Sequence, residues 1–402
     1  MTSEWNHFAL GEITELVIDY RGKTPKKLGG DWCKQGYRAL SAKNIKTGRI
    51  VQAETIRYID ESLYRKWMKD EVQRGDILIT SEAPFGQIFF WDSDEKIVLS
   101  QRLFCVRIKP EYDARFIYYY MTTPEFQSEL DGRATGTTVI GLRQPELMKC
   151  IIRCPEIQEQ KVIAAILSSI DAKIIANEKV NDNLEQQAQA IYHERFETVS
   201  PNDLPYDWRI VTLGEVVTIS NKSFNPLKEP EILLEHYSIP AFDEARFPVF
   251  ELSTSIKSNK FIIDASCFMI SKLNPTTKRV WKPYCLTEDA VCSTEFIVYK
   301  AKDQAITDFL YSVIDSGSFS NFMCSHVTGS TGSRQRTTPA ETLSYKLILP
   351  SENELAEFQS LVSPMYAQMR INAIENDKLK RLRDSLLPKL MSGEIDVSAV
   401  QL

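Results

Sequence analysis

The chain has 402 residues, of which 43% are hydrophobic and 25% are charged, and its formal net charge is −6. This composition supplies enough apolar residues for two or three packed domains and is not that of a disordered chain. The chain shows no run of about 18 apolar residues, no signal peptide and only scattered cysteines. We therefore expect a cytoplasmic protein with reduced thiols and no membrane partner.

Residues 1–155 are predicted to form a mixed α/β domain. Short β-rich runs bounded by Gly, Pro, Asp and Ser lie at 76–80, 87–91 and 103–108. Helices are predicted over 114–121 and from Thr123-Pro124 onward, and they are followed by a Gly/Thr-rich loop over 133–141.

The same block carries a concentrated positive charge. Residues 21–49 contain nine Lys and Arg residues against one acid, Asp31. A local basic patch matters more for phosphate binding than the average charge of the chain. These residues therefore favour nucleic-acid binding, although an ordinary solvated surface charge is the alternative for any single Lys or Arg.

A long helix is predicted over 156–197, where apolar residues recur at spacings of three and four. About 40 residues at 1.5 Å each would make a rod near 60 Å long. A second block, 198–350, repeats the order of strands, helix and Gly/Thr loop, and 351–402 again begins with a long amphipathic helix. Neither helix can bury its apolar stripe alone, so we expect the two to pack as a coiled-coil pair.

The two halves of the chain are predicted to be copies of one plan. Leu10-Gly11-Glu12 matches Leu213-Gly214-Glu215 at an offset of 203, and from Pro155 and Pro350 onward the offset is constant at 195. The helices match better than the blocks, which indicates one scaffold carrying two different heads. The predicted fold class is α/β (α+β): two similar mixed α/β domains separated by two long antiparallel coiled-coil helices, with a pseudo-two-fold internal repeat.

Four asparagines fall on the apolar seams of the predicted helices: Asn177, Asn181, Asn372 and Asn376. A buried Asn in a coiled coil costs stability but fixes register and orientation. The alternative is a partly open seam in which these side chains bond solvent.

Motifs for catalysis are missing from the sequence. It contains no Gly-x4-Gly-Lys-Ser/Thr loop and no Gly-x-Gly-x-x-Gly after a strand. Asn274-Pro275-Thr276-Thr277 lacks the second proline and the aromatic residue of an adenine methyltransferase motif, and Cys150 and Cys154 have no second pair at zinc spacing. We therefore expect no catalytic residues, no cofactor and no metal.

Basic and polar loop residues in both blocks are the candidates for DNA contacts. Lys neutralises phosphates, whereas Arg, Asn and Gln can read base edges. In the first block they are Arg21, Lys23, Lys26, Lys27, Lys43, Asn44, Arg102, Arg133, Thr137 and Thr138. In the second block they are Lys272, Lys278, Arg279, Ser330, Thr331, Arg334 and Arg336.

Several strings in this chain resemble the DNA-specificity (S) subunits of type I restriction–modification enzymes. They are Gly75-Asp76-Ile77-Leu78, Pro155-Glu156-Ile157-Gln158-Glu159-Gln160, Leu213-Gly214-Glu215 and, most specifically, the C-terminal run 379–395. The second block departs from this pattern, because Cys267-Phe268-Met269-Ile270 stands where Gly-Asp-Ile-Leu is expected.

The resemblance implies two target-recognition domains, 1–155 and 198–350, each reading half of a bipartite, asymmetric site in double-stranded DNA. It implies that the helical segments 156–197 and 351–402 act as spacers gripped by two methyltransferase (M) subunits, with restriction (R) subunits in the full complex. The seam residues expected to serve partner binding are Asn177, Asn181, Leu184, Ile191, Asn372, Asn376, Leu379 and Leu386. The alternatives are a single-chain DNA methyltransferase or endonuclease, or a tandem scaffold protein that does not bind DNA.

Overall fold

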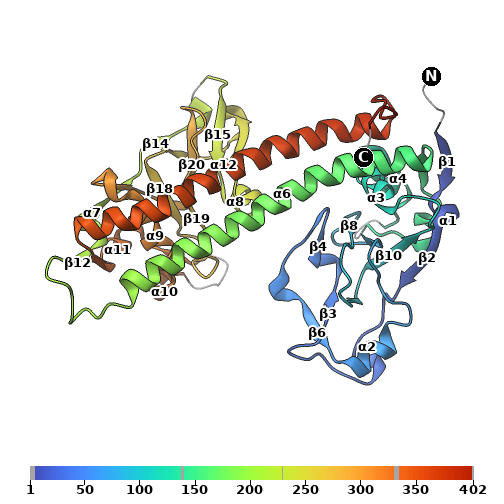
Figure 1. Cartoon of the computed structure of the whole chain (residues 1–402), viewed down its shortest axis with the longest axis horizontal. Coiled ribbons are helices and arrows are strands. Elements are labelled where there is room, and N and C mark those ends of the chain that lie inside the picture. The colour runs from blue at the N-terminus through green and yellow to red at the C-terminus, as the bar shows by residue number, and fades with distance from the viewer. Residues whose placement is uncertain (1–4, 137–139, 229, 330–334, 401–402) are drawn as a thin grey trace. The chain divides into compact units, whose positions relative to one another are not determined.

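The computed structural model describes residues 5–136, 140–228, 230–329 and 335–400. It divides into two compact units: unit 1 comprises Met1–Ala172 with Leu379–Leu402, and unit 2 comprises Lys173–Lys378. The long helices α6 (Ile157–Tyr192) and α12 (Glu352–Met391) each contribute one part to each unit (Figure 1). Both units are mixed α/β, as the sequence predicts, and helix α12 lies in the segment 351–402 where a long helix is predicted.

Unit 1 is built on a four-stranded antiparallel sheet in the order β2-β10-β7-β8. Its strands are β2 (Thr14–Asp19), β10 (Leu103–Ile108), β7 (Ile77–Thr80) and β8 (Ile88–Phe90). Smaller pairings join β1 (Asn6–Ala9) to β11 (Ile151–Cys154), β4 (Ile45–Lys46) to β5 (Arg49–Ile50), and β3 (Tyr37–Leu40) to β6 (Arg57–Ile59) and β9 (Val98–Leu99).

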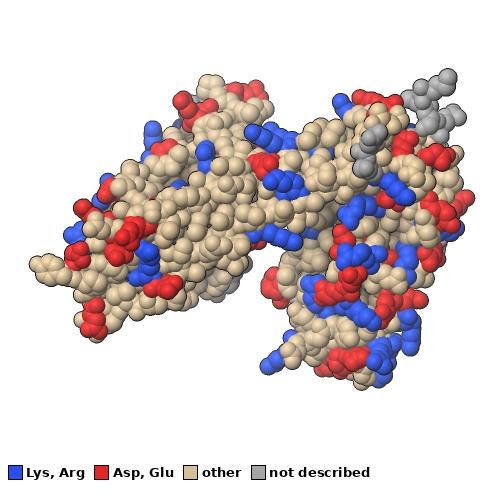
Figure 2. Space-filling model, in the orientation of Figure 1, with Lys and Arg blue, Asp and Glu red and all other residues tan. Residues whose placement is uncertain are grey.

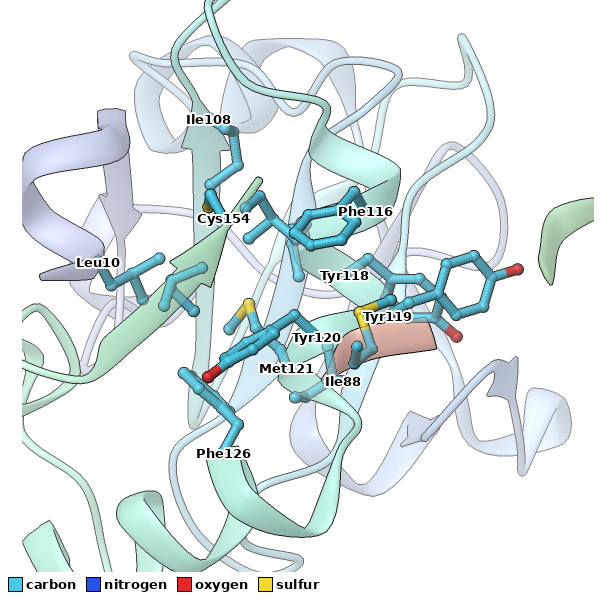
Figure 3. Close-up of a cluster of buried hydrophobic side chains, with 14 of the residues drawn as sticks. Leu10, Ile88, Ile108, Phe116, Tyr118, Tyr119, Tyr120, Met121, Phe126 and Cys154 are labelled. Atoms are coloured by element: carbon cyan, nitrogen blue, oxygen red, sulfur yellow. The ribbon is translucent and has the colours of Figure 1, made fainter. Parts of the chain in front are cut away.

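Helices α1 (Leu10–Ile13), α2 (Glu61–Trp67), α3 (Ala114–Met121), α4 (Pro124–Arg133) and α5 (Gln144–Leu147) complete unit 1. Asp113 caps the N-terminus of α3 and Thr123 caps that of α4. Each side chain accepts a backbone N–H of the first helical turn. Figure 3 shows Phe116, Tyr120 and Met121 of α3 in the core, near Leu10 and Cys154. The start of α6 and the end of α12 close the same core.

Unit 2 has the corresponding sheet, β13-β21-β18-β19. Its strands are β13 (Val217–Ser220), β21 (Phe296–Ala301), β18 (Cys267–Ser271) and β19 (Val280–Trp281). A five-stranded sheet orders β14 (Ser223–Phe224), β17 (Lys260–Ile262), β20 (Ala290–Ser293), β15 (Leu233–Tyr237) and β16 (Val249–Leu252). Two further pairs join β12 (Arg209–Thr212) to β24 (Lys346–Leu349) and β22 (Val327–Thr328) to β23 (Arg336–Thr337).

The helices of unit 2 are α7 (Leu213–Val216), α8 (Ile239–Ala245), α9 (Thr307–Asp315), α10 (Gly317–Ser325) and α11 (Pro339–Thr342). After α6, a π-helical turn, His193–Glu197, leads into this unit. Strand β18 pairs with β21 as β7 pairs with β10, so the loss of Gly-Asp-Ile-Leu leaves the strand arrangement intact. The ion pair between Asp76 and Arg107 is replaced by one between Asp264 and Lys300.

The repeated Leu-Gly-Glu has a structural reason that is the same in both units. The N–H of Gly11 donates to the carbonyl of Met148 at 2.9 Å, and that of Gly214 donates to the carbonyl of Leu343 at 2.9 Å. A Cβ on either glycine would lie 3.2–3.3 Å from the side chain of the residue that accepts this bond. Glu12 and Glu215 cap the same turn by accepting the backbone N–H three residues before them. Glycine is required because the two chain segments approach so closely.

In unit 2 the helices α6 and α12 run antiparallel, and the seam asparagines bond one another. Asn177 donates to Asn376 and Asn372 donates to Asn181, both at 2.8 Å. Asn177, Asn372 and Asn376 are at most 5% exposed. Of the two expectations for these residues, the structure has the buried pairs, which specify one register.

In unit 1 the helix ends are joined to the head by polar bonds as well as by the core. The carboxylate of Asp171 accepts the hydroxyl of Tyr119 at 2.6 Å and Nη1 of Arg383 at 2.8 Å. At the equivalent place in unit 2, Ser312 of α9 and Tyr366 of α12 share a hydrogen bond of 2.8 Å. Among the residues described, no helix is long and apolar enough to cross a lipid bilayer.

Candidate nucleic-acid interface

Three candidate DNA residues of unit 1, Lys43, Asn44 and Arg102, lie where several loops meet beyond the end of β7. The N–H of Ser81 donates to the carbonyl of Arg102 at 2.9 Å, and the N–H of Leu142 donates to the carbonyl of Ser81 at 3.0 Å. The N–H of Ala42 donates to the carbonyl of Gln101 at 3.1 Å. We call these meeting loops the unit 1 junction; its described residues are 41–48, 81–87, 100–102, 135–136 and 140–142.

Most of the arginines at or beside this junction already have acidic partners. Arg21 makes two bonds of 2.8 Å to Asp19, donates to the carbonyl of Leu142 and stacks on Phe104. Nε and Nη2 of Arg133 both donate to Glu129, and its Nη1 lies 3.7 Å from Glu146. These arginines hold the loops in place, because their N–H groups are taken on more than one side.

Arg102 also has an acidic partner, but its side chain is more exposed than those of Arg21 and Arg133. Its Nε lies 2.8 Å from Glu82 Oε1, its side chain is 48% exposed, and its backbone has a φ of +66°. A non-glycine residue with positive φ is uncommon and marks a backbone held by its surroundings.

Lys43 and Asn44 lie in one 3-10 turn of the junction but have different surroundings. Lys43 is exposed. Asn44 is 1% exposed, and its amide bonds Ser41, Gln52 and Thr55. Asn44 therefore organises the loop, and we leave it out of the proposed contact surface.

The basic turn near Lys26 lies against α2, outside the junction. Lys23 donates to the carbonyl of Trp67 at 2.8 Å and covers the ring of Tyr20, and burial lowers its pKa. Lys26 and Lys27 are exposed, and Lys27 donates to the carbonyl of Gly22. Of the three lysines, Lys26 and Lys27 are the exposed ones.

Unit 2 repeats the junction with two equivalent backbone bonds. The N–H of Lys272 donates to the carbonyl of Glu295 at 2.9 Å, and the N–H of Thr337 donates to the carbonyl of Lys272 at 3.1 Å. Glu295 directly precedes β21 as Arg102 directly precedes β10. We call residues 272–279, 293–295 and 335–337 the unit 2 junction.

The acid and the base of the ion pair at this place exchange positions between the two units. In unit 2 the residue before the strand is the acid, and Glu295 accepts Nε of Arg336 at 2.9 Å and its Nη2 at 3.1 Å. These bonds raise the pKa of Arg336. The two heads thus share a backbone frame but present different side chains on it.

The remaining candidates of unit 2 lie on the turn between β18 and β19. Nζ of Lys278 lies 2.7 Å from the buried carboxylate of Asp315, and burial raises the pKa of that carboxyl to about 6. Nε and Nη2 of Arg279 both donate to Asp243, and its side chain is only 13% exposed. Lys272 is half-buried at the junction itself.

Five predicted DNA residues fall outside the described part of the chain: Thr137, Thr138, Ser330, Thr331 and Arg334. The structure tests nothing about them. Figure 2 shows basic and acidic atoms intermixed over the visible face of unit 1, in keeping with the ion pairs above.

The predicted seam residues occupy three kinds of place. The asparagines bond each other inside unit 2, whereas Leu184 and Ile191 are half-buried on α6. Leu379 and Leu386 are half-buried on the part of α12 that belongs to unit 1. Cys150 and Cys154 are buried free thiols, and the described residues contain no group of three His, Cys, Asp or Glu side chains that could hold a metal.

Sequence reasoning missed the acids of the two junctions, Glu82 and Glu295. A search for DNA contacts looks for cations and so passes over carboxylates. The available signal was position, because each acid lies in a polar loop beside the end of a buried strand.

Comparison with known proteins bears on the family. Residues 2–186 match the family model of the type I restriction modification DNA specificity domain. The type I restriction enzyme MjaIX specificity subunit of Methanocaldococcus jannaschii is 25% identical over 353 residues, which are 81% of this chain and 78% of that protein. Residues 2–186 thus match a type I DNA specificity domain, and the chain as a whole is similar to type I specificity subunits.

Two further comparisons agree with this similarity. The MjaVIII specificity subunit of the same organism is 28% identical over 194 residues, 47% of this chain and 44% of that protein. The crystal structure of the type I S subunit from M. genitalium has the same fold, with a TM-score of 0.58, 16% identity and 96% of each chain covered. The relatives are specificity subunits by name, which does not favour the alternative of a single-chain methyltransferase or endonuclease.

Proposed function

We propose that this chain is a specificity subunit that binds double-stranded DNA without catalysing a reaction, and that each head reads one half of a bipartite, asymmetric site. The heads are residues 1–155 and 198–350. The observation that carries the proposal is the repeated junction, where equivalent backbone bonds present Arg102 with Glu82 in one unit and Glu295 with Arg336 in the other. Two heads with one frame and different side chains fit two different half-sites.

Lysines outside the ion pairs described above are the proposed phosphate contacts. Lys26, Lys27 and Lys43 are exposed in unit 1, and Lys272 lies at the junction of unit 2. Such contacts hold a protein on DNA without reading sequence. Each lost contact should reduce the salt dependence of binding, with a slope change of about 0.9 on logarithmic axes.

The helical segments 156–197 and 351–402 are the proposed docking surface for two methyltransferase (M) subunits, with restriction (R) subunits joining the full complex in the cytoplasm. The buried asparagines serve this docking only indirectly, because they bond each other. Outward apolar side chains on the helices of unit 2 are better placed for direct contact: Ile175, Val180, Leu361 and Ile371 are 42–58% exposed.

The helix pair is also the proposed spacer between the half-sites. The antiparallel pairs Asn177–Asn376 and Asn181–Asn372 place Asn183 opposite Arg370. One heptad inserted after Asn183 and one after Met369 would then lengthen both helices in register by about 10 Å. That length equals about three base pairs, so the preferred gap should lengthen or binding should be lost. Wild-type spacing at wild-type affinity would leave the helices as a docking surface only.

Selecting bound duplexes from a random library tests the function itself. The full chain is incubated with the library, with and without its methyltransferase partner, and bound DNA is sequenced. The proposal predicts two conserved segments separated by a fixed, unspecified gap. A tandem scaffold protein that does not bind DNA would enrich nothing, and a single contiguous motif would remove the two-head assignment.

A further inference from the structure

We infer that Arg102 is the residue with which unit 1 reads a guanine, and that Glu82 positions it. The inference rests on the proposed function and assigns the base chemistry that one side chain recognises. Arginine contacts guanine O6 and N7 with two N–H groups in one plane, which is the commonest specific contact to DNA. The half-site read by unit 1 should therefore contain a G·C pair at a defined position.

Two arginines beside the unit 1 junction, Arg21 and Arg133, are excluded by their bonds. Arg21 is held by Asp19, by the carbonyl of Leu142 and by the face of Phe104. Arg133 has Glu129 on its Nε and Nη2 and Glu146 near its Nη1. Neither can present a free pair of N–H groups without breaking the contacts that shape the loops.

Arg102 has the geometry that reading requires. Its Nε is fixed 2.8 Å from Glu82, while its side chain stays 48% exposed. The carboxylate beside Nε restricts the guanidinium and leaves the N–H groups of Nη1 and Nη2 for a base. A side chain already held in one orientation loses less rotamer entropy when it binds.

The backbone of Arg102 gives a second, independent observation. Its φ of +66° is a conformation that glycine adopts without strain and arginine does not. Its carbonyl accepts the N–H of Ser81, which fixes it at the centre of the junction. Glycine would fit this backbone conformation with less strain. That an arginine stands here instead points to a role for its side chain.

Unit 2 also places an arginine beside a carboxylate at its junction, with the positions of the two residues exchanged. Glu295 takes the place of Arg102 and fixes Arg336, which comes from a different loop, through Nε and Nη2. The Arg336 side chain is 43% exposed. Both units thus place one arginine beside a carboxylate at the junction, but from opposite sides of the frame.

The test compares Arg102→Lys with wild type in the full chain, using site selection from a random duplex library. Lysine keeps the charge but lacks the planar pair of donors. Preference for G over other bases at one position should fall by about 5- to 150-fold, with the second half-site and the salt slope unchanged. Glu82→Gln should weaken preference at that same position. Arg102→Gly should lose it as well while leaving the melting temperature unchanged or raised, because glycine relieves the strain.

Arg74→Lys is the matched control. Arg74 is an exposed arginine of unit 1 that pairs with Asp92 and Asp94 at the other end of β7, and its replacement should leave the selected sequence unchanged. If Arg102→Lys binds DNA with every base preference intact, the inference is wrong and the proposed function stands. If the wild-type chain selects no sequence, the proposed function itself fails.

Discussion

The asparagine pairs of unit 2 allow a stability prediction that follows directly from their geometry. Asn177→Leu removes the amide that donates to Oδ1 of Asn376 at 2.8 Å, and Asn376 is 5% exposed. A buried acceptor left without its donor costs about 1–3 kcal/mol. For a unit of this size that corresponds to a fall in melting temperature of roughly 2–12 °C.

Replacing both partners should reverse much of this loss. In Asn177→Leu with Asn376→Leu, an apolar contact replaces the polar pair, and such exchanges are often neutral or stabilising. The pair Asn181–Asn372 still specifies the register. A double-mutant cycle on thermal unfolding should therefore give a coupling of about 0.5–3 kcal/mol. Gln187→Ala, which removes an exposed bond to Asn183 on the same helix, is the control and should change stability by under about 0.5 kcal/mol.

Two outcomes would refute this reasoning. If Asn177→Leu is as stable as wild type, the buried bond contributes nothing. If the double variant is less stable than both single variants combined, the asparagines do more than satisfy each other.

Three more predictions follow from single contacts. Lys26→Ala with Lys27→Ala should weaken binding to all duplexes alike and lower the salt dependence of binding. Lys23→Ala should chiefly lower the melting temperature, because Lys23 bonds the carbonyl of Trp67 and covers the ring of Tyr20. A changed target sequence in either variant would contradict the prediction. Gly11→Ala and Gly214→Ala should each lower the free energy of unfolding by about 1–3 kcal/mol through overpacking. Gly132→Ala is the control, because Gly132 has open space around it in α4, and it should be neutral or stabilising by up to about 1 kcal/mol. Chemical denaturation measures all three. The pKa of the Asp315 carboxyl is about 6 in the folded protein, above its usual 3.8, so the free energy of unfolding should fall as pH rises from about 4 to 6. Asp315→Asn should remove about 3 kcal/mol of this pH dependence. Identical pH profiles for the variant and the wild type would disprove the prediction.

The scaffold was predictable from the sequence because its rules are local and periodic. The constant offset of 195 and the apolar spacing predict both long helices, and α6 and α12 lie in the two predicted segments. Even the pairs Asn177–Asn376 and Asn181–Asn372 follow from that repeat once the helices are antiparallel. The strands at 77–80 and 103–108 lie where β-rich runs end at turn residues.

The interface was less predictable because its bonds join residues far apart in the chain. Nothing near Arg21 in sequence shows that the carbonyl of Leu142 will accept its Nη1. Asn44 looks like a base reader in a polar loop, yet its partners, Gln52 and Thr55, close the loop around it. Net charge counts cations but cannot tell which of them already face a carboxylate.

Photo-crosslinking from one position in each head tests the central claim most directly. A photoreactive residue replaces exposed Lys43 in unit 1 or Lys272 at the junction of unit 2, in the full chain bound to its selected duplex. The account predicts crosslinks from position 43 in one conserved segment and from position 272 in the other, on opposite sides of the unspecified gap. Crosslinks from both positions to the same segment would contradict the division of the DNA site between two heads.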